Sequence, residues 1–174
     1  MGDHVLYLDT EQTPLPAAMR ETYLADLLAW VLDGCRRAIR AGVATRRIRR
    51  AASSLCDALF GWTGPACKLD RWHSIGPHAA LRRSANLSPD AIAILLYAAA
   101  PELWSNLALV YSAISATSRG VPDRQVLGAL LGDPTAVARE LAPTAPLVQT
   151  GLVSVGDTGE VSVDRDLLRR LTGS

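Results

Sequence analysis

The sequence predicts a mainly α-helical protein with one small β-hairpin near its C-terminal end. Apolar residues recur at steps of three and four over residues 17–41 and again over 45–60, as on the buried face of an amphipathic helix. The four short helical segments after residue 86 each carry a proline at or beside their start, and proline is favoured in the first turn of a helix. Valine and serine then alternate on both sides of residues 156–159, Gly-Asp-Thr-Gly, a pattern typical of a hairpin.

The N-terminal half is predicted to form two long helices. In the first, residues 17–41, one apolar stripe is expected to face the core, and Gly42 ends the helix. In the second, residues 45–60, four arginines lie opposite the apolar side. Because only a few residues connect the two helices, they most simply pack as an antiparallel hairpin. The stripe of the first helix consists of Leu24, Leu28, Val31, Cys35 and Ile39.

Residues 61–85 contain several glycines and prolines and are expected to be an irregular linkage. We therefore place a boundary near residue 80, between an N-terminal helical region (1–80) and a second domain (81–174). Residues 5–8, Val-Leu-Tyr-Leu, are compatible with a short strand or a packed arm.

The second domain carries a start signal for each of its predicted helices. A capping side chain or a proline stands at the first position of each, and Gly132 ends the third. The Pro101 signal predicts that one helix stops and another restarts at that point. The five signals are Ser88-Pro89, Pro101-Glu102, Pro122-Asp123, Asp133-Pro134 and Asp164.

Helices followed by a strand, a turn and a second strand are the plan of a winged-helix domain. In DNA-binding members the third helix enters the major groove. Here the third predicted helix, residues 122–131, contains one arginine, one glutamine and one acidic residue. This is too little positive charge for contacts with several phosphates. The turn carries Asp157 and Glu160, where a DNA-binding wing is usually basic. Both features favour a surface that faces protein, so we expect a protein partner or self-association and no nucleic acid.

Composition supports an ordinary globular protein of the bacterial cytoplasm. Net charge is +1, so no global electrostatic argument favours nucleic acid or a membrane. The basic residues are 17 arginines and the single lysine Lys68, as in proteins of GC-rich bacterial genomes. Three cysteines cannot all pair within one chain, and no signal peptide or membrane-spanning run is visible.

The strongest charge feature is an arginine cluster in the second helix. Its functional interpretation is a patch for phosphates or for an acidic protein surface. The alternative is a solvated helix face balanced by Asp26, Asp33 and Asp57. We predict a protein-contact role for the cluster together with Asp157 and Glu160 of the turn. The cluster consists of Arg46, Arg47, Arg49 and Arg50.

We predict no enzyme activity, no cofactor and no metal for these residues. Lys68 lacks the glycine before it and the hydroxyl after it that a phosphate-binding loop requires. No Gly-x-Ser-x-Gly elbow is present. Zinc is a possible but weak alternative, because the cysteines are not closely spaced as in a structural site. The potential ligands would be Cys56, Cys67, His73 and His78.

The C-terminal half resembles the variant winged-helix region that precedes the ATPase core in a family of bacterial AAA ATPases found near contractile injection systems. The likeness begins at Leu87-Ser88-Pro89-Asp90 and the apolar run 91–100, and continues through residues 101–104. It extends to the Pro-Leu and Gly-Leu segment of residues 141–153 and to the closing helix 164–173. The resemblance implies a non-catalytic docking role for residues 80–174.

The same resemblance implies an ATPase core after Ser174, which this sequence does not contain. We therefore expect no ATP hydrolysis from these residues. The preferred function is a protein-interaction or assembly module. The alternatives are a winged-helix DNA-binding transcriptional regulator and, less favoured, a small enzyme or secreted effector.

Overall fold

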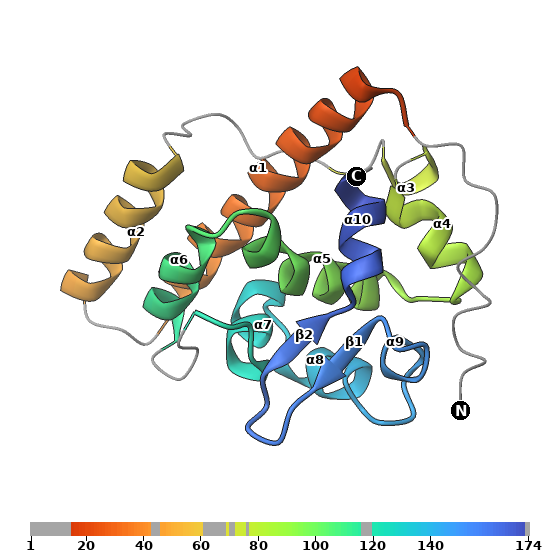
Figure 1. Ribbon diagram of the computed structural model, residues 1–174. Coiled ribbons are helices and arrows are strands. Elements are labelled where there is room, and N and C mark those ends of the chain that lie inside the picture. The colour runs from red at the N-terminus through yellow and green to blue at the C-terminus, as the bar shows by residue number, and fades with distance from the viewer. Residues whose placement is uncertain are drawn as a thin grey trace.

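The computed structural model describes residues 15–42, 46–60, 69, 72–75, 77–115 and 120–172, and it is mainly helical (Figure 1). The predicted helical class with a small C-terminal sheet is confirmed, while the possible strand at residues 5–8 lies outside the described residues. The elements are α1 (Ala17–Ala41), α2 (Arg46–Phe60), α3 (Trp72–Ile75), α4 (Pro77–Ser84), α5 (Pro89–Leu103), α6 (Leu107–Ile114), α7 (Arg124–Leu131), α8 (Pro134–Glu140), α9 (Pro146–Gln149), β1 (Val153–Val155), β2 (Val161–Val163) and α10 (Arg165–Thr172).

α1 and α2 form the predicted antiparallel hairpin. Arg36 of α1 forms an ion pair with Asp57, near the end of α2. Arg49, near the start of α2, donates to the carbonyl of Arg40, one turn further along α1. The two helices therefore run in opposite directions. Figure 1 shows α2 beside the C-terminal half of α1, with α6 also against it.

α1 buries a wider face than the single predicted stripe, because it lies across α5, α6 and α7. Val31, Cys35 and Ile39 are buried as predicted, whereas Leu24 and Leu28 are partly exposed at the edge of the core. A helix that contacts several neighbours needs apolar residues over more than one narrow stripe. The buried residues of α1 are Tyr23, Leu27, Ala29, Val31, Leu32, Gly34, Cys35, Ala38 and Ile39.

α5 is the central helix and meets α1 at Gly34. The Trp30 ring stacks on the Tyr97 ring with 4.3 Å between their centroids. A Cβ atom at position 34 would overlap the Tyr97 ring, with only 2.8 Å to its Cε1 atom. The missing side chain at Gly34 is therefore what lets the two helices cross so closely.

The predicted helix restart at Pro101 is wrong, because α5 continues through this proline to Leu103. Proline has no N–H to give to the carbonyl four residues earlier, which is that of Tyr97. The hydroxyl of Tyr111 on α6 donates to the Tyr97 carbonyl instead, at 2.7 Å and fully buried. The missing backbone bond is thus replaced by a side chain, and the helix ends one turn later than predicted.

The predicted caps of the other short helices are confirmed. The side chain of Ser88 accepts from the Ala91 N–H at 3.1 Å and begins α5. Asp123 and Asp133 begin α7 and α8 in the same way, each accepting the N–H three residues further on. Gly132 ends α7 with φ of 77°, a conformation that glycine adopts without strain.

β1 and β2 form the predicted hairpin, with Val153 opposite Val163 and Val155 opposite Val161. One face is buried through Val153 and Val161, and on the other face the Ser154 and Ser162 hydroxyls hydrogen-bond at 2.8 Å. The alternation of valine and serine therefore separates the core face from the solvent face. An isolated antiparallel bridge joins Glu160, just before β2, to Asp123, just before α7.

Residues 77–84 are not irregular linkage as predicted, because they form α4, and α3 precedes it. His78, Ala79 and Leu81 are buried, and Pro77 stands at the first position of α4, where a proline is favoured. The boundary placed near residue 80 falls inside α4, and one cluster of buried side chains extends from α1 to α10. The division into two regions stays a prediction about independent folding.

The closing helix α10 begins after Asp164, whose side chain accepts the Leu167 N–H at 3.3 Å, as predicted. Leu167 and Leu171 are buried, and α10 packs against α4 and α5. Across the described residues, no helix combines the length and the apolar character needed to cross a membrane.

Candidate interaction surface

A groove lined by arginines runs between α1 and α2, with a volume of about 440 Å³. Two of these arginines come from the last turns of α1 and three from the first two turns of α2. Because the helices are antiparallel, these two ends lie side by side. We call this site the arginine groove; its lining residues are Arg36, Ile39, Arg40, Arg46, Arg49, Arg50 and Ser53.

Most of the positive charge in the arginine groove is not neutralised by described neighbours. Arg36 is paired with Asp57 at 2.9 Å. In the described part of the chain, no carboxylate lies within ion-pair distance of Arg46, Arg49 or Arg50. Several arginines close together in one groove favour a ligand that carries more than one negative charge.

The structure divides the predicted arginine cluster. Arg46, Arg49 and Arg50 line the groove, whereas Arg47 is exposed on α2 outside its lining. Arg40 joins them from α1 and was not among the predicted contact residues. Its signal in the sequence was the spacing of four residues between Arg36 and Arg40 at the end of a helix whose antiparallel partner begins with arginines.

A second groove, of about 560 Å³, lies where the C-terminal end of α1 meets α7 and α8. α7 and α8 are joined by the tight turn at Gly132, and Pro134 at the start of α8 packs beside Gly128 of α7. Small and apolar residues dominate its walls, so we call it the apolar groove. Its lining residues are Ala38, Ala41, Gly42, Arg124, Gln125, Gly128, Ala129, Gly132, Pro134, Val137 and Ala138.

The two grooves share one wall, the last turn of α1. Ile39 and Arg40 line the arginine groove, whereas Ala38 and Ala41 line the apolar groove. Residues that are neighbours in this turn therefore line two grooves, one positively charged and the other apolar. A ligand that lies across this turn can contact an apolar surface and a positively charged surface at once.

The acidic turn of the hairpin is not part of this surface. Asp157 is exposed in the turn, and the Glu160 carboxylate accepts a hydrogen bond from the Thr158 hydroxyl within the same turn. This hydrogen bond lowers the pKa of the Glu160 carboxyl. The backbone of Glu160 is tied to Asp123 beside α7, so the structure does not bring the two acids together with the arginines of α2.

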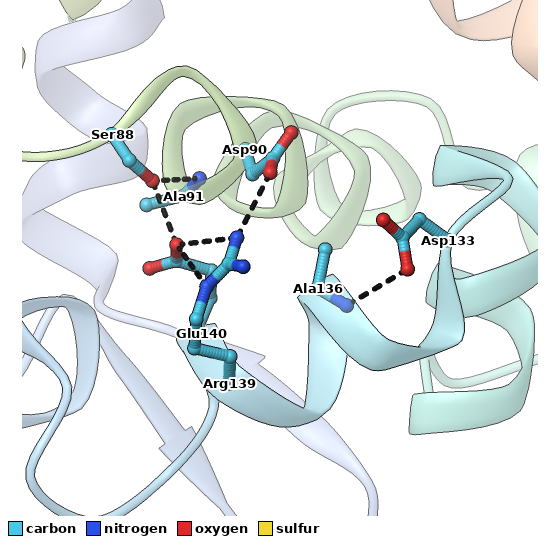
Figure 2. Close-up of polar contacts among 7 residues, drawn as sticks. All are labelled: Ser88, Asp90, Ala91, Asp133, Ala136, Arg139 and Glu140. Carbon is cyan, nitrogen blue, oxygen red and sulfur yellow. Dashed lines mark hydrogen bonds and ion pairs between the residues drawn. The ribbon is translucent and has the colours of Figure 1, made fainter.

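A polar network holds α8 against the start of α5 (Figure 2). Glu140, which is only 8% exposed, accepts a hydrogen bond from the Ser88 hydroxyl at 2.8 Å. Arg139 reaches Glu140 at 3.4 Å and Asp90 at 3.1 Å, so one guanidinium bridges two carboxylates. Figure 2 shows these contacts at one end of α8 and the Asp133 cap at the other. The contacts of Glu140 and Arg139 hold the C-terminal end of α8 against α5, and α8 forms one wall of the apolar groove.

A buried cluster around His78 fixes the first half of α1 against α3 and α4. The Nδ1 atom of His78 lies 3.1 Å from the Tyr23 hydroxyl, and its Nε2 atom lies 3.2 Å from Nδ1 of His73. Trp72 donates from its indole N–H to Asp26 at 2.8 Å. Burial, and then the nearby His73 and Arg82, lower the pKa of His78 to about 4, so this ring is neutral at pH 7.

The residues weighed as zinc ligands are not gathered into one described site. His73 and His78 contact each other, Cys56 is buried on α2, and Cys67 lies outside the described residues. Among the described side chains, no group of three or more His, Cys, Asp or Glu residues could hold a metal ion. Burial raises the pKa of both Cys35 and Cys56, which keeps these thiols protonated.

Comparisons of the sequence with family models, with curated proteins and with solved structures found no match.

Proposed function

We propose that this chain is a non-catalytic protein-interaction module that binds its partner over the last turn of α1 and the exposed sides of α7 and α8. The observation that carries the proposal is the apolar groove. It is within the size range of ligand-binding clefts, and among the described residues that line it only Arg124 and Gln125 have polar side chains. A concave apolar surface of this kind suits the apolar side of another protein element.

The proposal includes a winged-helix arrangement for residues 81–174, supported by the bridge between Asp123 and Glu160. This bridge places a short extended segment before α7 and beside β2, which is the order of elements along the chain of a winged helix. Counted in that order, the third helix is α8, and not the helix that we predicted at residues 122–131. The single basic residue of α8, Arg139, already contacts Asp90 and Glu140. Neither helix therefore offers the cationic face that a DNA regulator requires.

The resemblance of residues 80–174 to the region before an AAA ATPase core agrees with this role. A module of that kind would bring a partner to a neighbouring catalytic domain and would do no chemistry itself. The wing acids Asp157 and Glu160, on this proposal, shape the hairpin turn and keep DNA away instead of forming the contact.

The first test is site-specific photo-crosslinking from the apolar groove. A benzophenone amino acid at Ala129, which is exposed in the groove, should give one defined protein adduct in cells. The same amino acid at Ser162, exposed on the hairpin, is the matched control and should give none. Equal adducts from both positions would contradict a specific surface.

The second test addresses the DNA alternative by fluorescence polarisation with labelled duplexes. We expect weak binding without sequence preference even at about 50 mM salt, because non-specific binding depends on phosphate contacts. Tight, sequence-selective binding that weakens steeply as salt is added would refute the interaction-module proposal and support a regulator.

A further inference from the structure

We propose that the two grooves together receive an acidic amphipathic helix of the partner. The inference rests on the proposed function and specifies the partner's chemistry. Apolar residues of the incoming helix would occupy the apolar groove, and its acidic residues would contact the arginine groove across the last turn of α1.

The shared wall sets the geometry of this complex. Ala38 and Ala41 line one groove, and Arg40, between them in sequence, lines the other. A helix carries apolar and charged residues on adjacent sides of its surface, three and four positions apart. Such a helix, laid along this turn, presents both sides at once to the two grooves, in the mode by which amphipathic helices bind apolar clefts.

Charge complementarity identifies the incoming residues as carboxylates. Among the described residues, Arg46, Arg49 and Arg50 have no carboxylate within ion-pair distance. At the edge of the same groove, Arg36 already binds the Asp57 carboxylate at 2.9 Å, so an arginine of this site binds a carboxylate within the protein itself. The guanidinium fork matches a carboxylate with two parallel hydrogen bonds.

The composition of the groove argues against a nucleic acid as its ligand. Single-stranded nucleic acids are bound by aromatic side chains that stack on the bases, together with positive charge. The described lining of the arginine groove contains no aromatic residue. The neighbouring apolar groove is lined mainly by alanine, glycine, proline and valine, whose side chains offer no donors to phosphates.

The test uses a fluorescein-labelled designed helical peptide, with leucines on one side and glutamates on the other, and the full chain. Binding is measured by fluorescence anisotropy. Two control peptides replace the glutamates by lysines or the leucines by serines, and each should bind at least tenfold more weakly. Raising the salt from about 50 to 300 mM should weaken binding of the acidic peptide severalfold, because exposed ion pairs are screened.

Variants of the protein locate the site. The double variant Arg46→Glu/Arg50→Glu should weaken binding at least tenfold. Arg47→Glu is the matched control, because Arg47 lies on the same helix but outside the groove, and it should change binding less than threefold. Ala129→Trp, which fills the apolar groove, should weaken binding at least tenfold, whereas Thr135→Trp on the exposed side of α8 should not. Circular dichroism confirms that each variant is folded.

Each contrary result has a distinct meaning. An equal loss with Arg47→Glu, equal binding of the lysine peptide, or no binding at 1 mM peptide would overturn the proposal, taking about 1 mM as the limit of a specific weak complex. Sedimentation that shows a wild-type dimer and a monomeric Arg46→Glu/Arg50→Glu variant would instead assign the groove to a second copy of the chain. Crosslinking from position 129 would still test the proposed function independently of these outcomes.

Discussion

Replacing Tyr111 by phenylalanine removes one oxygen atom from the centre of the protein and leaves the ring in place. That oxygen donates to the Tyr97 carbonyl at 2.7 Å, and both tyrosines are essentially inaccessible to solvent. Pro101 has no N–H with which to bond this carbonyl, so the substitution leaves a buried acceptor without its partner. A buried group that loses its partner costs about 1–3 kcal/mol. We therefore expect Tyr111→Phe to lower the free energy of unfolding by about 2 kcal/mol.

The substitution Pro101→Ala provides the decisive second half of the experiment, because it restores an N–H four residues after Tyr97. In the Pro101→Ala background, loss of the Tyr111 hydroxyl should cost less than about 1 kcal/mol, since the backbone donor takes its place. The difference between the two costs is the coupling energy of a double-mutant cycle. Tyr23→Phe is the matched control, because the Tyr23 hydroxyl contacts His78 and has no relation to Pro101.

The assay is urea unfolding at 25 °C followed by far-UV circular dichroism, with the four proteins of the cycle measured side by side. The control should cost the same in both backgrounds. The reasoning fails if Tyr111→Phe lowers the free energy of unfolding by less than about 0.5 kcal/mol, or if its cost does not depend on residue 101.

Three further predictions concern the packing that supports the two grooves. Gly34→Ala should destabilise the protein by about 1–2 kcal/mol in urea unfolding, because overlap with Tyr97 outweighs the gain in helix propensity; a stabilised variant would contradict this crossing. Below pH 6.5 the unfolded chain protonates His78 whereas the folded protein resists protonation down to about pH 4, so stability should fall by about 3 kcal/mol over this range. His78→Gln should remove that part of the pH dependence, and unchanged dependence would contradict the burial argument. Ser88→Ala should cost about 1–2 kcal/mol through the lost cap and the lost bond to Glu140, measured as a shift in the urea midpoint.

The starts of α5, α7, α8 and α10 and the hairpin were predictable from local sequence because their signals lie close together along the chain. The hydroxyl of Ser88 and the carboxylate of Asp133 each cap the N–H three positions further on, and such a contact requires no knowledge of the fold. The Val-Ser alternation of residues 153–155 and 161–163 fixes the register of the sheet for the same reason.

Elements whose stability depends on distant partners were not predictable in this way. Pro101 is a breaker by local rules, and the residue that compensates for it, Tyr111, belongs to another helix. α4 and α9 each begin at a proline, but they have only eight and four residues, and they bury His78 and Leu147 respectively. Helices this short depend on tertiary packing for their stability.

The candidate site likewise combines features that local sequence reveals with features that depend on how the helices pack. The arginines of α2 were visible as a cluster, but a cluster in sequence does not reveal which members face a common groove. The antiparallel packing of α1 and α2 selects Arg46, Arg49 and Arg50 and leaves Arg47 outside. The apolar groove was not predicted, because its walls come from three helices and consist of small residues such as Ala38, which carry no signal of function.

α1 connects the stability of the fold to the geometry of the proposed interaction surface. Its first half is fixed by the contact between Tyr23 and His78, its middle by the crossing at Gly34, and its last turn forms the wall between the two grooves. A helix of 25 residues that is held at two points behaves as a stiff element, so displacement at Gly34 should also shift the position of Arg40 relative to α2. Substitutions far from the grooves, on this argument, weaken binding of an acidic helix by moving a wall without touching the ligand.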